Sequence, residues 1–561
     1  MRPEYEDITF YCHNLSGYDV IFIVNVINKY NENTDIDNQY KLEPLLRDSK
    51  IIKLTIKKGK RKVTLTDSLC ILTSSLAKLG KDFEVQVQKS FFPYKFSIKQ
   101  NLFYVGPTPS IDYYNGISLD KYNNIKIDNW SFKDKTIEYL NDDLNCLFEV
   151  IFKANKQIHK DYNINMMESV TISGLAMKIF LNKYYNNNIP KISKPSIYKD
   201  LKQAYYGGIT EVYRPYGENL FYYDVNSLYP YAALNDMPGL STNKVIYFEN
   251  NENINNLFGF FHCDITSPTN LYLGLLPIRN KFGIESPLGS WNGWYFSEEL
   301  KFAQENGYTI KVNKGYIFDR QKSVFDNYIN EIYKIKSNPK SNTQKAIAKS
   351  LLNNLLGRFR INLSKATTKI VSEDTFNELS LMNKITSYKV IGDDKCIVSY
   401  IPSLDNDIIK SHGLDILKVL TKYNDKEIQE MNNSSIVISA AVTAYARIHM
   451  SKLKLYILSK QGNIFYSDTD SIVTDIKLNN DMIHPNELGK LKLEHEIKKA
   501  IFITNKTYCL INQDGQFINK AKGLKHSSLT YNDYLMLLDN KNVTTGIKTQ
   551  SKTKIKQIDS Q

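Results

Sequence analysis

The stretch Phe221-Tyr-Tyr-Asp-Val-Asn-Ser-Leu-Tyr-Pro230 is the most informative part of the sequence. Its aromatic and β-branched residues favour a strand that carries Asp224 to its end, and Pro230 prevents the strand from continuing. A carboxylate among apolar side chains is costly to bury unless a hydrogen-bond donor or a cation compensates its charge. The stretch therefore predicts an acid that a strand delivers to a polar site.

A second acidic stretch is Ile464-Phe-Tyr-Ser-Asp-Thr-Asp-Ser-Ile-Val473. Apolar residues on both sides of its aspartates predict a β-hairpin with Asp468 and Asp470 at the tip. These acids can be ordinary turn residues. If the fold brings them to Asp224, they instead form the carboxylate pair of a two-metal phosphoryl-transfer site.

A third segment, residues 344–359, has the spacing of a helix. Two lysines, an amide and a glycine recur every four residues and so share one helical face, and leucine and isoleucine line the opposite side. Such a face suits a flat base pair and nucleotide phosphates, although an ordinary surface helix with exposed lysines has the same pattern. The residues of this face are Lys345, Lys349, Asn353 and Gly357.

The composition is that of a globular protein with several domains. At 561 residues the chain should hold about three or four domains. With 42% hydrophobic and 23% charged residues it is not wholly disordered, and it has no apolar run long enough for a membrane span. Its six cysteines form no CxxC pair, which argues against a zinc cluster or a disulfide framework. The net charge of +13 indicates a polyanionic partner or merely a solvated basic surface.

Hydrophobic patterning predicts a mixture of strands and helices along the whole chain. The expected strands are 18–26 and 51–56, followed by a basic turn at 57–62. The expected helices are 138–158, 165–186, 324–359 with a break at Asn338-Pro339, and 434–459. We expect a linker at 189–195 and a loop-rich segment at 259–287.

Taken together, the three segments resemble motifs A, B and C of family B DNA polymerases, in the order and spacing of that family. The chain resembles more narrowly the protein-primed branch found in phages and in linear plasmids of fungal and plant mitochondria. Tyr205-Tyr-Gly207-Gly208 matches the linker between exonuclease and polymerase domains of that branch, and Lys506-Thr-Tyr508 matches its Lys-x-Tyr motif. The resemblance extends over nearly the whole chain.

This resemblance implies a role for each matching residue. Asp224, Asp470 and the Val225 carbonyl would bind two Mg²⁺ ions, or Mn²⁺ in their place, and Asp468 would support the same site. Nucleotide binding would fall to Tyr229, Lys345, Lys349 and Asn353. Contacts with template and primer would come from Tyr205, Gly207, Gly208, Lys506 and Tyr508. Motif B departs from the family pattern at Asn354 and Leu356, where the family usually has Ser and often has Tyr.

The amino-terminal part resembles the 3′–5′ exonuclease of the same family, but incompletely. The second motif is matched by His13, Asn14 and Asp19, the third by Tyr139 and Asp143, and a DNA-holding segment by Ser68 and Leu69. The first motif, Asp-x-Glu, has no match, and a two-metal nuclease site lacks half its carboxylates without it. We therefore expect weak or absent proofreading, a truncated copy or fragment, and an exposed sheet edge where a strand is missing. Asp19 and Asp143 can alternatively serve only as structural hydrogen-bond acceptors.

The resemblance implies an α/β multidomain, right-hand polymerase fold of palm, fingers and thumb, preceded by an incomplete RNase H-like 3′–5′ exonuclease domain. The expected boundaries are as follows: exonuclease-like domain 1–158, connecting helices and linker 159–200, first palm part 201–240, first insertion 241–323, fingers 324–364, second insertion with palm elements 365–432, second palm part 433–500, and thumb 501–561.

The function implied is DNA-directed DNA synthesis from dNTPs on a template, starting from a primer or from the hydroxyl of a terminal protein, with no membrane partner. It would serve a mitochondrial linear plasmid or its integrated copy, and residues with A+T-rich codons fit a mitochondrial location. The alternative is a degenerate, non-catalytic DNA-binding remnant. A reverse transcriptase is disfavoured, because that class has adjacent aspartates where this chain has Asp-Thr-Asp.

Overall fold

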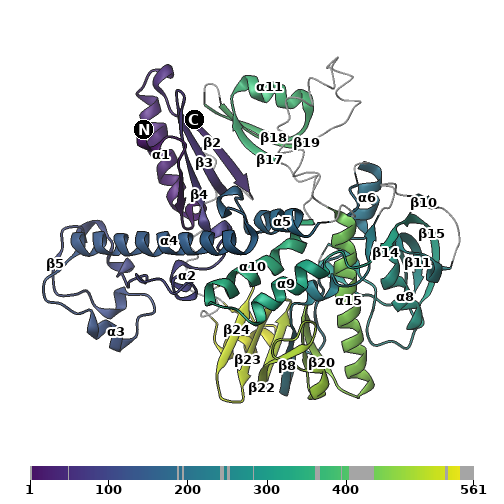
Figure 1. The fold of residues 1–561 in the computed structure, drawn as a ribbon. Coiled ribbons are helices and arrows are strands. Elements are labelled where there is room, and N and C mark those ends of the chain that lie inside the picture. The colour runs from purple at the N-terminus through teal and green to yellow at the C-terminus, as the bar shows by residue number, and fades with distance from the viewer. Residues whose placement is uncertain are drawn as a thin grey trace. The chain divides into compact units, whose positions relative to one another are not determined.

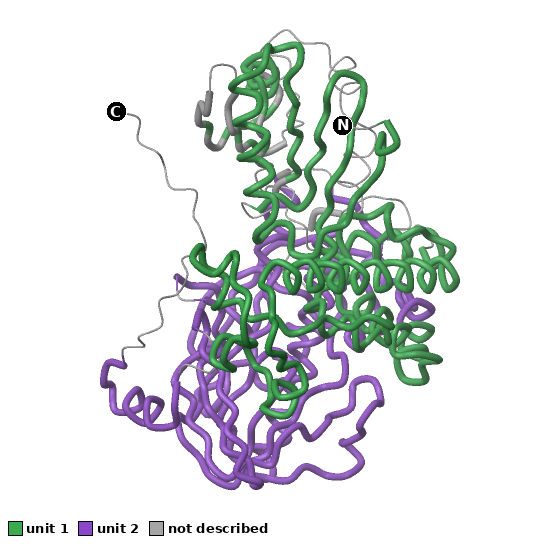
Figure 2. Tube along the Cα trace, turned by 90° about the vertical axis from the view of Figure 1, so that its left-hand side faces the viewer, with its two compact units in different colours: residues 1–185, 330–434 green, residues 186–329, 435–561 purple. Residues whose placement is uncertain are grey.

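The computed structural model describes residues 3–47, 50–185, 189–192, 195–239, 246–248, 253–281, 283–359, 367–392, 395–402, 435–524 and 529–543. The chain forms two compact units, each assembled from two segments that are far apart in sequence (Figure 2). Unit 1 comprises residues 1–185 and 330–434, and unit 2 comprises residues 186–329 and 435–561. Each unit is described by itself. No helix among the described residues is long and apolar enough to cross a bilayer.

A seven-stranded sheet is the centre of unit 2 (Figure 1). Its strand order is β24-β23-β22-β8-β21-β20-β7, so the strand that ends at Asp224 lies in the interior of the sheet. The strands are β7 (Thr210–Val212), β8 (Tyr216–Val225), β20 (Ile464–Asp468), β21 (Ser471–Thr474), β22 (Leu491–Thr504), β23 (Thr507–Asn512) and β24 (Phe517–Ala521). The hairpin predicted at 464–473 is therefore confirmed as β20 and β21. The expected boundary between palm and thumb, at 500/501, lies inside β22.

Helices flank this sheet. The helix predicted at 434–459 is confirmed as α15 (Ile436–Ser459), which packs on α7 (Leu228–Ala232) and on β20. Small buried residues such as Ala440, Ala441 and Ala444 let neighbouring backbones approach α15 closely. Two further helices of the unit are α6 (Pro195–Gln203) and α16 (Tyr531–Leu538).

A second sheet in unit 2 corrects part of the expectation of a loop-rich segment at 259–287, of which 267–277 do form a loop. That segment begins with β11 (Gly259–Thr266), an interior strand whose Phe260 and Phe261 are fully buried. Gly259 is not a turn residue here: a Cβ at this position would lie 2.0 Å from the Tyr316 carbonyl oxygen, so the glycine permits close strand contact. The other strands of this sheet are β10 (Ile246–Phe248), β14 (Ser290–Phe296) and β15 (Thr309–Ile317). Unit 2 also contains β9 (Met237–Gly239), β12 (Ile278–Asn280), β13 (Gly283–Glu285), α8 (Ser297–Glu305) and β16 (Asp319–Gln321).

Unit 1 contains a four-stranded sheet of order β1-β4-β3-β2. The strands are β1 (Thr9–Cys12), β2 (Lys41–Arg47), β3 (Lys50–Lys58) and β4 (Arg61–Asp67), which confirms the strand expected at 51–56. The strand expected at 18–26 is wrong, because this segment lies in helix α1 (Asp19–Glu32). Val20, Ile23, Val24 and Ile27 have helical spacing and pack on the sheet, so tertiary packing overrides their β-branched preference for a strand.

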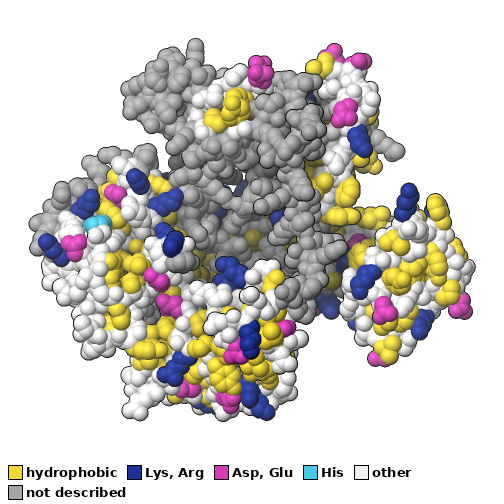
Figure 3. Space-filling view, turned by 180° about the vertical axis from the view of Figure 1, so that it is seen from behind, with side chains coloured by type: hydrophobic (Ala, Val, Ile, Leu, Met, Phe, Trp, Pro, Cys, Tyr) yellow, Lys and Arg dark blue, Asp and Glu magenta, His cyan; other side chains and the backbone are white. Residues whose placement is uncertain are grey.

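A long helix follows this sheet in unit 1. The helix predicted at 138–158 is confirmed within α4 (Phe132–Tyr162), whereas the one expected at 165–186 is shorter, α5 (Ile172–Lys183). Hydrophobic side chains gather on the surface of the part that holds α3 (right-hand side of Figure 3), where Phe103 is 93% exposed. The smaller elements are α2 (Leu76–Asp82), β5 (Val105–Gly106), α3 (Leu119–Asn124) and β6 (Trp130–Ser131).

The segment predicted as helical at 324–359 forms α9 (Asp326–Ser337) and α10 (Asn342–Phe359), and the break at Asn338-Pro339 is confirmed. In unit 1, α10 packs on α5. The described part of 365–432, the expected second insertion, is a three-stranded sheet with one helix. Its elements are β17 (Thr367–Val371), α11 (Glu373–Met382), β18 (Asn383–Gly392) and β19 (Lys395–Pro402).

Candidate active site

The register of the central sheet brings two of the predicted aspartates together. β21 pairs antiparallel with β8, and Asp224 lies opposite Ser471, the residue that follows Asp470. The Val225 N–H donates a hydrogen bond of 2.8 Å to the carbonyl oxygen of Asp470. Asp224 and Asp470, which are distant in sequence, therefore lie on neighbouring strands at one end of the sheet.

Both of these carboxyl groups lie in a setting that opposes ionisation. Burial, followed by the charges of Asp470 and Glu494, raises the pKa of Asp224 to about 7. Burial and the charge of Asp468 also raise the pKa of Asp470, against the effect of its own backbone N–H. Among the described residues, neither aspartate has a lysine, arginine or histidine nitrogen within 4.0 Å. Two close carboxyl groups without a counter-ion are suited to share a cation.

Asp468 lies in a different electrostatic setting. Lys506 Nζ contacts both of its carboxylate oxygens at 2.7 Å, and Thr210 Oγ1 donates to one of them at 2.8 Å. Although burial favours the neutral form, the hydrogen bonds from Lys506 and Thr210 hold the pKa of Asp468 below its ordinary value. Lys506 has a positive φ of 64°, and its backbone N–H donates to the hydroxyl of Tyr466 at 3.2 Å. The predicted Lys-x-Tyr motif therefore directly contacts the hairpin of β20 and β21, here called the aspartate hairpin.

The donor set around Asp224 fits a divalent metal ion that substrate helps to hold. The described residues contain no group of three or more His, Cys, Asp or Glu side chains placed to hold a metal by themselves. Mg²⁺ in phosphoryl-transfer sites is usually held by one or two carboxylates together with substrate phosphates and water. The charge repulsion between Asp224 and Asp470 is the kind that a divalent cation would relieve.

Sequence reasoning missed two charged residues beside this pair. Lys492 is the register partner of Asp224 on β22, and Lys492 Nζ lies 2.8 Å from Glu494 Oε1. The charge of Glu494 raises the pKa of Asp224, and that of Lys492 lowers it. The alternation of apolar and charged residues over 491–496 marks a strand, but nothing in it shows which strand lies alongside.

The predicted template-contacting segment lies against the aspartate hairpin. The Thr469 N–H donates to the Ile209 carbonyl oxygen at 2.9 Å. A Cβ on Gly208 would lie 2.5 Å from the Thr469 side chain. Any other residue at position 208 would therefore force one of the two loops to shift. Gly208 is therefore needed for the close approach of the two loops. Gly207 and Tyr205 precede it and are half-buried.

The two remaining residues predicted around this site differ in exposure. Tyr229 lies half-buried on α7, one turn beyond Asp224. Tyr508 is only 3% exposed, with its ring centroid 5.2 Å from that of Tyr466. The role of Tyr508 in primer binding stays a prediction, as does the packing of Tyr229 under a nucleotide sugar.

The predicted nucleotide-binding helix is α10 of unit 1. Lys345, Lys349, Asn353 and Gly357 all lie on its exposed face, so the shared face is confirmed. Its opposite face is buried by Ile347, Leu351, Leu352 and Leu355. The structure thus supports the geometry of this face, and its ligand stays a prediction.

The amino-terminal motif residues form a tightly bonded cluster. Asp67 is fully buried and accepts hydrogen bonds from the backbone N–H groups of Asn14, Ser16 and Leu69 at 2.9–3.0 Å. The ring of His13 lies 3.0 Å from the hydroxyl oxygen of Ser68, which is itself buried. Asp67, which was not predicted as a site residue, is therefore the structural centre of these motifs.

The third exonuclease-like motif is contacted by a lysine from a distant part of the chain, Lys89, that sequence reasoning missed. Lys89 Nζ contacts Asp143 at 2.5 Å and also the hydroxyl of Tyr139. Asp19 is largely exposed, but partial burial of its carboxyl group and the charge of Asp67 raise its pKa against the effect of its own backbone N–H. Asp143 thus already has a cationic partner, unlike the aspartate pair of unit 2.

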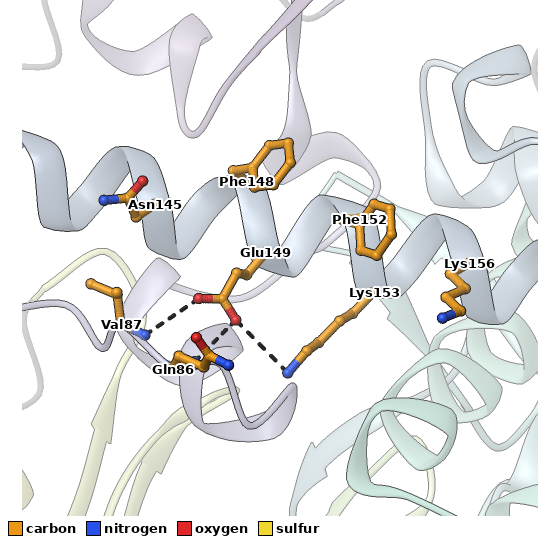
Figure 4. A pocket seen from close by; sticks show the side chains of 8 residues that line it. All are labelled: Gln86, Val87, Asn145, Phe148, Glu149, Phe152, Lys153 and Lys156. Atoms are coloured by element: carbon orange, nitrogen blue, oxygen red, sulfur yellow. Dashed lines mark hydrogen bonds and ion pairs between the residues drawn. The ribbon is translucent and has the colours of Figure 1, made fainter.

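A pocket of about 560 Å³ opens beside α4 in unit 1 (Figure 4). Glu149 accepts hydrogen bonds from the backbone N–H groups of Gln86 and Val87, and Phe148 and Phe152 also line the pocket. The two rings stack with centroids 6.2 Å apart.

Comparison with known proteins identifies the class of fold. The chain superposes on the φ29 DNA polymerase in complex with primer-template DNA and incoming nucleotide, with a TM-score of 0.64 and 19% identity over 94% of this chain and 86% of that one. The fold is therefore that of a right-hand polymerase with palm, fingers and thumb preceded by an exonuclease domain.

Residues 1–455 match the family described as DNA polymerase type B, organellar and viral, and the chain belongs to this family. It is 41% identical to a probable DNA polymerase of Podospora anserina over 99% of this chain and 50% of that protein. It is 33% identical to a probable DNA polymerase of Neurospora intermedia over 95% of this chain and 55% of that protein. The chain thus spans about half the length of these curated relatives.

Proposed function

We propose that this chain is a DNA-directed DNA polymerase that adds deoxynucleotides to a 3′-OH primer end by a two-metal mechanism. The observation that carries the proposal is the strand register, in which Asp224 lies beside Asp470 and neither carboxylate has a basic nitrogen within 4.0 Å among the described residues. Membership of the polymerase family and the polymerase fold support it.

The side chains of the chain have distinct parts in this mechanism. Asp224 and Asp470, with the Val225 carbonyl, would hold two Mg²⁺ ions. When bound, these ions lower the pKa of the primer hydroxyl and stabilise charge on the α-phosphate and the leaving pyrophosphate. Lys506 keeps Asp468 ionised at the edge of the site, and Lys345 and Lys349 offer ammonium groups to nucleotide phosphates.

The priming, location and role in replication are finer parts of the same proposal. A hydroxyl of a terminal protein would replace the primer end, and the substrate replicon would be a mitochondrial linear plasmid or its integrated copy. The fungal relatives and the match to an organellar and viral family support this setting.

We also propose that this polypeptide proofreads weakly or not at all. Its exonuclease-like motifs supply Asp19 and Asp143, and Asp143 is already paired with Lys89 at 2.5 Å. Because Lys89 already pairs with Asp143, this carboxylate would have to lose its ammonium partner before it could bind a metal ion.

A primer-extension assay with Mg²⁺ and dNTPs tests the main proposal. The parent chain should extend a labelled primer on a template, and Asp470→Asn should abolish extension while leaving DNA binding nearly intact. Asp481→Asn, an exposed acid of the same unit, is the matched control and should extend like the parent. A parent chain that binds primer-template DNA but adds no nucleotide would identify it as the non-catalytic remnant instead.

A further inference from the structure

A fully buried ion pair lies behind the template-contacting segment Tyr205–Gly208, here called the linker segment. Arg447 of α15 and Glu299 of α8 form two parallel hydrogen bonds of 2.7 Å, and their side chains are only 4% and 2% exposed. Burial disfavours the charged guanidinium, but the field and hydrogen bonds of Glu299 outweigh it and raise the pKa of Arg447. A buried ion pair of this kind is a weak source of stability, because desolvation of both charges offsets their attraction.

The remaining hydrogen-bond capacity of Arg447 is directed to the linker segment. Its Nη1 donates to the carbonyl oxygens of Tyr206 and Gly207 at 2.6 and 3.1 Å. Arg279 holds the preceding residue, since its Nη2 donates to the Tyr205 carbonyl oxygen at 2.7 Å. Three successive carbonyl groups of the linker segment are thus bound by two arginines.

Ring stacking also restrains the linker segment. The Tyr206 ring stacks on that of Tyr295, with centroids 5.6 Å apart and planes 14° apart. The guanidinium groups of Arg279 and Arg447 lie 5.5 and 5.7 Å from the Tyr206 ring centroid. Tyr206 is therefore enclosed, and little freedom is left to the backbone on either side of it.

The linker segment and the residues that follow it contact the aspartate hairpin directly. Gly208 contacts Thr469, the residue between Asp468 and Asp470, so closely that a Cβ would lie 2.5 Å from it. The next two residues bond the hairpin: the Ile209 carbonyl accepts from the Thr469 N–H, and Thr210 Oγ1 donates to Asp468.

We propose that Glu299 and Arg447 are positioning residues that hold the linker segment, and through it the aspartate hairpin, in the geometry needed for nucleotide addition. Both side chains are buried, and Arg447 bonds the linker segment itself, so we assign them a role through that segment. The inference rests on the proposed polymerase function, but the physical coupling that it asserts can be measured without catalysis.

The first test compares two neighbouring glutamates of α8. Glu299→Gln removes the charge that orients Arg447, whereas Glu298→Gln makes the same change in a residue that pairs with Arg320 and Lys301 and does not touch the linker segment. Because a misplacement of about 1 Å can cost about 10²-fold in rate, we expect Glu299→Gln to lower kcat by about 10–10²-fold. The KM for dNTP should change far less, and Glu298→Gln should stay within about twofold of the parent.

Amide hydrogen exchange gives a readout that does not depend on activity. Glu299→Gln should accelerate exchange of the Thr469 amide, whose acceptor is Ile209, while Glu298→Gln should not. If the parent adds no nucleotides but this difference in exchange is found, the polymerase proposal fails and the coupling stands. Equal exchange and equal kcat in the two variants would overturn the coupling.

A pair of loop variants tests the same coupling if Glu299→Gln fails to fold. Gly208→Ala places a methyl group against Thr469 and should lower kcat at least tenfold. Thr469→Gly, added to it, removes the clashing side chain and also suits the positive φ of 59° at this position. Restoration of kcat in the double variant supports the coupling, whereas a defect equal to that of Gly208→Ala contradicts it.

Discussion

Asp224 and Asp470 in unit 2 lie on neighbouring strands, and among the described residues no basic nitrogen lies within 4.0 Å of either carboxylate; Asp143 in unit 1, by contrast, lies 2.5 Å from Lys89 Nζ. Asp67 of unit 1 is satisfied in another way, by three backbone N–H groups. Asp67 and Asp143 of unit 1 therefore have their compensation within the protein, whereas burial raises the pKa of both Asp224 and Asp470, and neither of these has a basic nitrogen within 4.0 Å among the described residues. The electrostatic setting of an acid, more than its motif, therefore indicates whether the acid is poised to bind a metal ion.

Four Asp→Asn substitutions give the largest expected contrast. Asp224→Asn and Asp470→Asn should each lower primer extension by about 10³-fold or more, because each removes a charge that the metal ions need. Asp19→Asn and Asp143→Asn should leave extension within about twofold of the parent. Single-turnover rates on one primer-template measure all four, and a large loss in either unit 1 variant would refute the comparison.

Asp67→Asn should affect stability and not catalysis. An amide presents one acceptor oxygen and a misplaced donor to the three N–H groups that the carboxylate satisfies, which should cost about 1–3 kcal/mol. Chemical denaturation followed by a probe in unit 1 measures the loss. Asp37→Asn, at an exposed position of the same unit, should be neutral. A stability equal to that of the parent would show that Asp67 does not organise these motifs.

The two lysines that pair with aspartates should differ in consequence. Lys506→Ala deprives Asp468 of its bidentate partner and should slow primer extension about tenfold, the order of one lost charge-assisted hydrogen bond. Lys89→Ala frees Asp143 in unit 1 and should leave the extension rate as it is. Steady-state kcat for both variants tests this difference. Equal losses of kcat would contradict the prediction that only the lysine paired with Asp468 supports nucleotide addition.

The smallest predicted effect concerns stability without metal. In the folded chain Asp224 has a pKa of about 7 against an ordinary value of 3.8, so the folded state retains a proton that the unfolded chain loses between these values. Stability should therefore fall as pH rises from about 4 to about 7, and Asp224→Asn should remove this loss. At pH 8 in EDTA the variant should be more stable by about 1–2 kcal/mol after allowance for solvent screening, and no different at pH 4. Thermal melts at the two pH values test this, and an unstabilised variant at pH 8 would contradict it.

Sequence patterns were sufficient for the local structure around the candidate catalytic acids. An aromatic strand ending at Asp224, a hairpin with Asp468 and Asp470 at its tip, and a helix with Lys345 and Lys349 on one face are all present. Each depends on contacts within a few residues, which the period of apolar residues and the turn residues describe well. The same rules failed at α1, where packing on a sheet overrides the strand preference of a β-branched run.

What surrounds those acids was decided only by tertiary structure. Lys506 on Asp468, Glu494 near Asp224, Lys89 on Asp143, and Glu299 on Arg447 are pairs from different elements, and none has a fixed spacing in sequence. The sequence alone indicated which side chains are candidates for the chemistry and which strands and helices present them. Their charge states and their partners depend on strand register and burial, because electrostatic energies follow distance in space and the local dielectric.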